Sequence, residues 1–184
     1  SIGSEISRQV IKNKPEKIIL LDSSEYALYS IKNELSKLNS EQEIEVLSIL
    51  GSVTNKNKIS ELCQVFNVKT IYHAAAYKHV SLVEENPFEA VINNIFGTKI
   101  CAEAASEAGV ETFVLISTDK AVRPTNIMGA TKRFAELILQ SMSKKTKTKM
   151  TMVRFGNVIN SSGSVIPLFR EQIISGGPIT VTHK

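Results

Sequence analysis

The sequence predicts an α/β fold built on a doubly wound parallel sheet, because two kinds of segment alternate along it. Short apolar runs alternate along the chain with amphipathic stretches of helical periodicity. Strands that alternate with helices are joined by right-handed crossovers, which place parallel strands side by side beneath helices. The 184 residues, of which 42% are hydrophobic and 22% charged, are enough for one soluble domain with its own core.

The first part of the chain predicts a helix, a strand, a helix and a strand. The opening SIGSEISRQVI repeats apolar residues at helical spacing. KIILLD (17–22) is a buried strand that ends in an acid, and a helix follows over 23–38, opened by a serine cap with a glutamate nearby. EIEVLSIL (43–50) alternates apolar and polar residues, which is typical of a second strand.

The middle of the chain continues the alternation. NKISELCQVF (57–66) has helical periodicity, and VKTIYHAAA (68–76) predicts a third strand. The stretch 86–109 predicts one long helix that ends at a glycine, the residue favoured just after a helix.

The last part predicts two strands, each followed by a helix. ETFVLIST (111–118) is a strand and 126–144 a helix. KMTMVRFGNV (149–158) is a further strand, and 165–176 is a final helix.

The two ends of the chain indicate a fragment. A doubly wound nucleotide-binding fold begins with a strand and a glycine-rich turn that lead into a helix. This chain opens on the helix, and Gly3 stands where the last glycine of that turn is expected. The final GGPITVTHK stops where another strand begins. We therefore expect the first strand and the C-terminal substrate-domain part to be missing from these residues.

Charge and cysteine content narrow the classes of function. The net charge is +4, and the one dense basic stretch, SKKTKTK (143–149), is best explained as a solvated loop after a helix. Cys63 and Cys101 lack metal-ligand spacing, so reduced thiols in a cytosolic compartment are the simplest account. No apolar run is long enough to span a membrane. The three histidines lack zinc-ligand spacing, and we expect neither a metal nor a nucleic-acid partner.

Four long blocks carry a resemblance to a known family. They are SIGSEISRQ, HAAAYKHVSLVEENPFEAVINNIFGT, STDKAVRPTNIMGATKR and VRFGNVINSSGSVIPLF. With these blocks in this order, the chain resembles the extended short-chain dehydrogenase/reductase superfamily. Within it the chain resembles the CapD-like polysaccharide-biosynthesis proteins, the UDP-N-acetylglucosamine 4,6-dehydratases. The resemblance implies a Rossmann-like NAD-binding domain fragment over 1–184, in which 155–184 leads into the substrate-binding region.

The resemblance also implies a reaction that uses tightly held NAD. Hydride leaves C4 of the sugar, water is eliminated across C5 and C6, and hydride returns to C6. The substrate would be UDP-N-acetylglucosamine and the product a 4-keto-6-deoxy sugar nucleotide for a surface polysaccharide or glycan. The location implied is the cytoplasm, with any membrane tether outside this chain, and we expect a homo-oligomer.

The acid at the end of the strand expected over 17–22 indicates NAD rather than NADP. Asp22 lies roughly 20 residues after Gly3, where a dinucleotide fold places the carboxylate that binds the adenosine ribose. That carboxylate would repel a 2′-phosphate. Asp22 or Ser23 also suits a helix cap, and the two roles are compatible.

The remaining cofactor contacts are implied by the resemblance. Read alone, the HAAA run suggests plain packing and Asn94 a polar helix residue. Ser52 departs from an Asp that many relatives have there, so its contact with adenine would be weaker. The implied cofactor residues are Ile2, Gly3, Asp22, Ser23, Ser52, Val53, Ala74, Ala75, Ala76, Asn94 and Lys132.

The run STDKAV, at the end of an expected strand, matches the family's catalytic residues. Lys120 matches the base for the C5 proton and Asp119 the acid for the C6 hydroxyl. These roles require a lowered lysine pKa and a raised aspartate pKa, which desolvation favours. The two side chains could instead form an ion pair, with both in the wrong protonation state. Thr118 is the matching hydroxyl for the sugar 4-OH and would relay its proton to water, Asp119 or a ribose hydroxyl.

Met128 stands where the family's tyrosine is expected, four residues before Lys132, which would bind the nicotinamide ribose. A methionine cannot transfer a proton, so we expect it to pack against sugar or cofactor. A methionine-bearing branch of the family is linked to retention of configuration at C5, and we interpret Met128 as a marker of that branch.

The implied substrate contacts lie in two places. Lys78 and His79 match residues at the mouth of the active site, which Glu84 and Glu85 could order. Asn157 would contact the diphosphate or sugar, and Ser164 would cap the next helix toward phosphate. Two alternatives remain: a 4-epimerase or other extended reductase, and a non-catalytic NAD-binding sensor or scaffold.

Overall fold

The computed structural model describes residues 1–39, 44–156, 158 and 165–180, and it confirms the predicted α/β fold with parallel strands. β1 (Lys17–Asp22) pairs with β2 (Glu45–Leu50), and β4 (Thr112–Thr118) pairs with both β3 (Thr70–His73) and β5 (Lys149–Phe155). Every one of these pairings is parallel. The described strands hydrogen-bond as two sheets rather than as one continuous sheet, because β1 and β3 do not pair.

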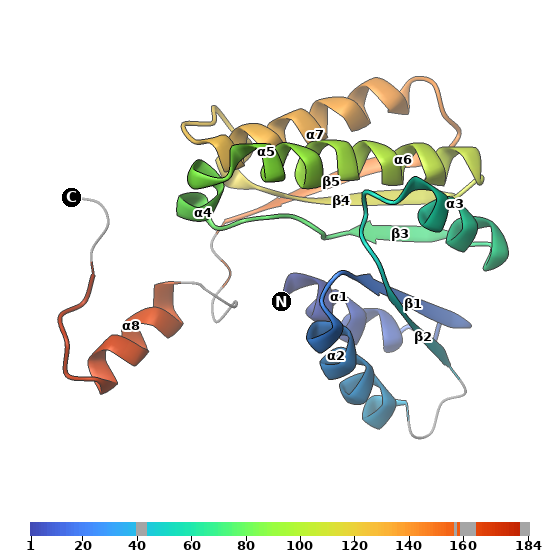
Figure 1. Cartoon of the computed structure of the whole chain (residues 1–184). Coiled ribbons are helices and arrows are strands. Elements are labelled where there is room, and N and C mark those ends of the chain that lie inside the picture. Colours follow the sequence, from blue (N-terminus) through green and yellow to red (C-terminus); the bar gives the residue numbers. More distant parts are fainter. Residues whose placement is uncertain (40–43, 157, 159–164, 181–184) are drawn as a thin grey trace.

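Helices pack against both sheets (Figure 1). α1 (Ile2–Ile11) and α2 (Glu25–Leu38) form a core with β1 and β2. α3 (Lys56–Val65), α6 (Gly97–Glu107) and α7 (Ile127–Ser143) bury the central core with β4. α8 (Val165–Ile174) stands apart from both sheets. No helix within the described ranges is long and apolar enough to cross a membrane.

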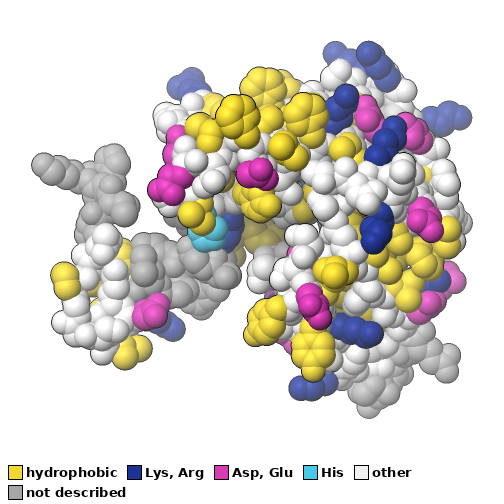
Figure 2. Space-filling view, in the orientation of Figure 1, with side chains coloured by type: hydrophobic (Ala, Val, Ile, Leu, Met, Phe, Trp, Pro, Cys, Tyr) yellow, Lys and Arg dark blue, Asp and Glu magenta, His cyan; other side chains and the backbone are white. Residues whose placement is uncertain are grey.

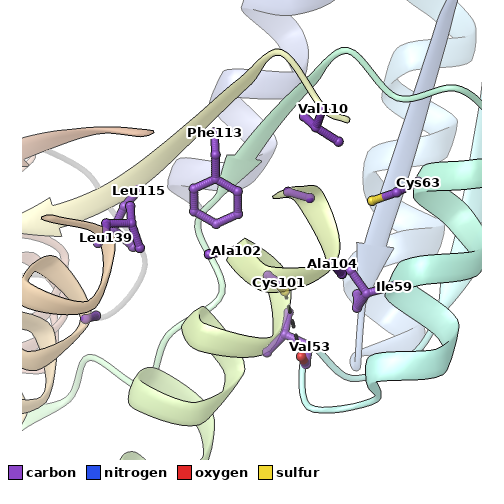
Figure 3. Close-up of a cluster of buried hydrophobic side chains, with 12 residues drawn as sticks. Val53, Ile59, Cys63, Cys101, Ala102, Ala104, Val110, Phe113, Leu115 and Leu139 are labelled. Carbon is purple, nitrogen blue, oxygen red and sulfur yellow. Dashed lines mark hydrogen bonds between the residues drawn. The ribbon is translucent and has the colours of Figure 1, made fainter. Parts of the chain in front are cut away.

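The central core joins segments that are distant in the sequence (Figure 3). Phe113 and Leu115 of β4 are fully buried beside alanines of α6 and Leu139 of α7. The side chains of both cysteines are free thiols buried in this cluster. Burial raises the pKa of the Cys101 thiol to about 12, so the thiol stays protonated at neutral pH.

Local signals explain where the main helices begin. The side chain of Asn126 caps α7 by accepting a hydrogen bond from the Gly129 N–H at 2.7 Å. At α2 the cap is Ser24 and not Asp22 or Ser23, since the Ser24 hydroxyl accepts from the Ala27 N–H. The Asp22 carboxylate instead accepts from the Ser24 N–H at 2.8 Å, which fixes the turn before the helix.

The predicted helix over 86–109 is interrupted, which the sequence did not indicate. It consists of α5 (Pro87–Ala90), a π-helix η1 (Val91–Phe96) and α6, and it ends before Gly109, whose φ is +74°. A π-helical turn within an α-helix is rare and is frequently found at functional sites.

Two elements were not expected: the helix α4 (Val80–Glu85) and a 3₁₀ turn η2 (Asp119–Ala121). Two strands end earlier than predicted. The third strand ends at His73 rather than at 76, and the fifth ends at Phe155 rather than at 158. The residues that follow these strands begin at the carboxyl edge of the β3–β4–β5 sheet, where ligands bind in open α/β sheets.

Candidate active site

The carboxyl ends of β3, β4 and β5 bring the expected catalytic residues together. β4 extends beyond β3, and Ser117 and Thr118 pair with Arg154 and Phe155 of β5. The 3₁₀ turn η2 follows β4 directly and packs against the start of α7. A Cβ added at Gly156 would lie 3.8 Å from the Asp119 carboxylate, so the chain after β5 passes beside the turn.

Thr118, Asp119 and Lys120 form one hydrogen-bonded group. Thr118 Oγ1 donates to Asp119 Oδ1 at 2.9 Å, and Lys120 Nζ donates to the same oxygen at 3.3 Å. The Lys120 N–H in turn donates to Thr118 Oγ1. The hydroxyl proton of Thr118 thus already points to Asp119, which is one of the three acceptors expected for it.

The Asp119 carboxyl does not have the raised pKa that its expected role as an acid requires. The hydrogen bond from Thr118 has the largest effect and lowers its pKa. Burial acts in the opposite direction, but the hydrogen bond and the charge of Lys120 lower the pKa further, so it lies below its ordinary value. The Asp119 side chain is 56% exposed, so water stabilises the charged form. The structure therefore corrects the expected protonation state and shows the ion pair that was the alternative.

Lys132 and Met128 lie on successive turns of α7, and both are buried. Lys132 is 5% exposed, and burial lowers its pKa to about 8, against an opposing effect from Glu136. Met128 is 4% exposed and packs with Val83 and Ala90. The apolar side chain contacts α4 and α5, where it is shielded from water, and its expected packing against sugar or cofactor stays a prediction.

A glycine allows the catalytic turn to approach α7 closely. A Cβ added at Gly129 would run into the carbonyl oxygen of Lys120. Gly129 is helical and needs no unusual backbone angle, so close approach is the reason for glycine at this position.

Asn94 holds the loop after β3 to both helices of the site. Its side chain accepts from the Tyr77 N–H at 2.8 Å and donates to the Tyr77 carbonyl at 3.0 Å. It also donates to Thr131 Oγ1, which donates to the Met128 carbonyl. The side chain is fully buried within the π-helix, so these bonds fix the backbone of the site.

The expected cofactor residues gather from both sheets. Gly3 lies in the first turn of α1, and a Cβ added there would meet the Ala74 Cβ at 3.8 Å. Asp22 and Ser23 are exposed after β1, and the Gly51 N–H donates to the Asp22 carbonyl, which places Ser52 near them. Small side chains (Ala74, Ala75, Ala76) and a helix N-terminus are what a dinucleotide pyrophosphate requires.

Val53 and Glu84 have contacts within the protein that the sequence did not indicate. The side chain of Val53 belongs to the core, where it meets Gly97, and its carbonyl accepts from the Cys101 thiol. Lys78 and His79 are exposed before α4, as expected of a site mouth. Glu84 accepts from the Ile127 N–H at 2.7 Å, so it caps α7 rather than ordering Lys78 or His79. Asn157 and Ser164 lie outside the described residues.

Glu136 is the residue that sequence reasoning missed. It is fully buried, and its carboxylate accepts from Ser117 Oγ, from Arg133 Nη1 and from two nitrogens of Arg154. Burial alone would raise its pKa, but these hydrogen bonds lower it to about 2. Its position four residues after Lys132, on the apolar side of a helix, was the available signal.

His73 is also buried, at the end of β3. Thr98 Oγ1 donates to the Asn94 carbonyl, so it accepts from His73 Nε2 at 2.9 Å, and the ring is the Nε2–H tautomer. Burial lowers its pKa to about 3. Within the described residues no group of three His, Cys, Asp or Glu side chains is placed to hold a metal ion.

Comparison with known sequences gives matches along the whole chain. A family model described as "Polysaccharide biosynthesis protein" matches residues 1–184. The capsular polysaccharide biosynthesis protein CapD of Staphylococcus aureus is 56% identical over 184 residues, which is 100% of this chain and 31% of that protein. An inverting UDP-N-acetylglucosamine 4,6-dehydratase of Campylobacter jejuni is 33% identical over 190 residues, covering 100% of this chain and 54% of the relative. The chain thus spans between a third and about half of the length of these relatives.

Solved structures share the fold. Pen from Bacillus thuringiensis superposes with a TM-score of 0.91 and 38% identity, over 99% of this chain and 57% of that protein. The dTDP-glucose 4,6-dehydratase DesIV from Streptomyces venezuelae, whose crystals contain NAD, has a TM-score of 0.80 and 22% identity, over 97% of this chain and 60% of the other.

Proposed function

The chain belongs to the polysaccharide biosynthesis protein family, and from that premise we propose that the whole protein is a UDP-N-acetylglucosamine 4,6-dehydratase that uses NAD. One observation carries the proposal. A hydroxyl, a carboxylate and an ammonium are hydrogen-bonded together at the carboxyl end of β4, beside the helix that holds Lys132. The similarity to a curated dehydratase at 33% identity supports the same substrate.

The residues present fit a dinucleotide. Gly3 and Ala74 add little side-chain bulk where they face each other, the start of α1 offers N–H groups to a pyrophosphate, and Asp22 suits the adenosine ribose. Lys132 would bind the nicotinamide ribose. NAD would supply a reversible acceptor for the hydride of C4. The structure of DesIV with NAD, on the same fold, supports this choice of cofactor.

The ion pair of Asp119 and Lys120 can be converted to the form that elimination requires by one proton transfer. A neutral lysine beside a protonated aspartate holds the same number of protons as the ion pair. A sugar bound over the turn excludes water, and desolvation favours the neutral form of both groups. Lys120 Nζ then takes the C5 proton and Asp119 gives its proton to the departing C6 hydroxyl. Thr118 accepts the proton of the 4-OH as it passes its own hydroxyl proton to water or a ribose hydroxyl.

Met128 stands in place of the tyrosine that serves as acid or base in the family, so the hydroxyl of Thr118 has to transfer the proton of the sugar 4-OH. We propose retention of configuration at C5, as in the methionine-bearing branch. The Campylobacter relative is described as inverting. The NMR coupling constants of the product at C5 distinguish retention from inversion of configuration. An inverted product would show that Met128 does not mark the retaining branch. Surface glycan synthesis, a cytoplasmic location and membrane contact only outside these residues belong to the same proposal.

The direct test is mass spectrometry of UDP-N-acetylglucosamine after incubation with the full-length protein and NAD. Loss of one water from the sugar nucleotide is expected. A product of unchanged mass with a new chromatographic position would indicate a 4-epimerase. An unchanged substrate, with NAD bound in a parallel binding assay, would favour the sensor or scaffold.

A further inference from the structure

Glu136 ties three elements together beneath the candidate site. Its Oε1 accepts from Ser117 Oγ at 2.7 Å and from Arg154 Nε at 2.8 Å. Its Oε2 accepts from Arg154 Nη2 at 2.6 Å and from Arg133 Nη1 at 2.9 Å. The carboxylate is fully buried, so these four donors come from β4, β5 and α7 and replace its hydration completely.

Each of these bonds ends next to a residue of the site. Ser117 immediately precedes Thr118, and Arg154 is followed by Phe155 and by Gly156, which borders Asp119. Because the paired ends of β4 and β5 are both held to one carboxylate, the turn that carries Asp119 and Lys120 keeps a fixed place relative to α7.

Glu136 also acts on the charge of Lys132, which lies one helical turn earlier. Burial disfavours the ammonium, and the negative charge of Glu136 favours it. His73 on β3 acts on Lys132 as well but is neutral at ordinary pH. Among the other charged groups on elements packed against α7, Arg154 and Arg133 bind Glu136, Asp119 binds Lys120, Glu84 binds the Ile127 N–H and Lys99 pairs with Glu103. Glu85, Glu89 and Lys149 are exposed to water, which screens their charges.

We infer that Glu136 is a positioning residue: its carboxylate locks the ends of β4 and β5 against α7, and its charge keeps Lys132 in the ammonium form that binds the cofactor. The inference rests on the proposed function for its catalytic consequence. Its electrostatic part concerns cofactor binding alone and can be tested even if the sugar is not dehydrated.

The first variant is Glu136→Gln, which preserves size and removes the charge. Lys132 then loses its proton at lower pH, because two arginines remain and the balancing carboxylate is gone. NAD affinity and kcat/KM are expected to fall at basic pH as Lys132 loses its proton, and we call this fall the basic limb. In the Glu136→Gln variant the basic limb is expected to move to lower pH by roughly one unit. A residue that only stabilises the fold would lower activity equally at all pH values.

Arg133→Gln provides a second test with the opposite sign. Arg133 is partly exposed, so the variant is expected to fold, and loss of its positive charge leaves Glu136 freer to stabilise the ammonium. The basic limb is expected to move to higher pH. Glu111→Gln removes a distant exposed carboxylate that pairs with Lys69 and should leave the limb unchanged.

Glu136→Asp separates the two effects. The shorter carboxylate keeps the charge but cannot reach all four donors, so the limb should stay in place while kcat falls. NAD binding is measured by calorimetry between pH 6 and 10 on the full-length protein, and turnover by sugar-nucleotide mass. If the basic limb stays at the wild-type pH in both Glu136→Gln and Arg133→Gln, the inference is wrong. If neither the wild type nor any variant turns over the sugar nucleotide, only the proposed function is wrong.

Discussion

At Asp119 an exposed carboxylate holds both the hydroxyl of Thr118 and the ammonium of Lys120. The lowered pKa of Asp119 follows from these two donors, and the proposed elimination needs that proton to come from Lys120. The protonation states of Asp119 and Lys120 therefore depend on whether water surrounds the turn. Deeper in the site, Lys132, Glu136 and His73 are shielded from water, and their charge states are set by the protein.

Removal of the proposed C5 base should stop the reaction without removing the cofactor. Lys120→Ala is expected to abolish dehydrated product, while NAD affinity changes less than about threefold, since Lys120 is not among the cofactor residues. The assays are product mass and NAD calorimetry. Lys56→Ala, which breaks an exposed ion pair with Glu107, serves as the control and should keep full turnover. Normal turnover by the Lys120→Ala variant would contradict the assignment of Lys120 as the C5 base.

Met128→Ala should weaken the fold more than the chemistry. The buried side chain packs with Val83 and Ala90, so truncation should cost about 2–5 kcal/mol of unfolding free energy and leave measurable activity. Met128→Leu conserves volume and should cost under about 1.5 kcal/mol. Urea unfolding and product formation are measured together. Complete loss of activity in a folded Met128→Ala protein would show that the methionine does more than fill space.

His73 makes stability depend on pH. Its folded pKa of about 3 is below the ordinary value of 6.5, so the unfolded chain binds the extra proton between these values. Stability is full above pH 6.5 and falls as the pH drops toward 3, by about 1.4 kcal/mol per unit from this group. His73→Gln should flatten the slope of unfolding free energy between pH 6 and 4. The exposed His79→Gln should leave the slope as it is in the wild type.

At the scale of elements, the site depends on how α7, the π-helix and the turn η2 meet. The π-helix places Asn94 between the Tyr77 backbone and Thr131, which joins the cofactor loop to α7. Gly129 brings α7 against the carbonyl of Lys120. Neither contact involves a charged side chain, so both fix geometry without adding any charge.

Gly129→Ala should destabilise the turn although alanine favours helices. The added Cβ meets the Lys120 carbonyl, and the overlap should cost about 1–3 kcal/mol, against a gain of up to about 1 kcal/mol from helix propensity. Activity should fall at least tenfold, because the shift moves Lys120. Gly177→Ala, whose Cβ would only touch Gln172, is the control for thermal unfolding and turnover. A more stable and fully active Gly129→Ala protein would contradict this account.

On the scale of the whole molecule, an apolar face covers two neighbouring helical runs. Hydrophobic side chains gather over α5, the π-helix, α6 and α7 (Figure 2). Phe88 is 80% exposed, and further exposed apolar residues lie along the same runs: Ile92, Phe96, Phe134 and Leu137. An exposed apolar surface of this kind is typical of a protein–protein contact, which agrees with the expected homo-oligomer.

Self-association through this face is a testable prediction. Phe96→Ser combined with Phe134→Ser should shift the sedimentation coefficient of the full-length protein toward that of a monomer, because apolar burial drives association. Tyr26→Ser, which changes an aromatic residue on α2 that is more exposed than Phe96 or Phe134, should leave the assembly unaltered. An unchanged oligomer in the double variant would place the contact elsewhere.

The sequence predicted the order and type of most elements because those depend on local periodicity and capping. β1 was predicted to the residue, and α7, from Ile127 to Ser143, differs by one residue at each end. The grouping of Thr118, Asp119 and Lys120 after β4 also follows from the sequence, since adjacent residues stay adjacent in any fold. What periodicity could not indicate was the π-helix at Val91–Phe96, where the side chain of Asn94 donates a hydrogen bond to Thr131, a residue far away in the chain.

The sequence by itself therefore determined the α/β fold, the family and the reacting groups of the proposed site. Only the tertiary structure decided their states: the ion pair of Asp119, the burial of Met128 against Val83 and Ala90, and the four donors on Glu136. The physical reason is that a pKa and a packing contact depend on solvent exclusion and on neighbours from other elements. Ser117 and Arg154 meet Glu136 across 19 and 18 positions of sequence, and that distance is closed only when the sheet and α7 pack together.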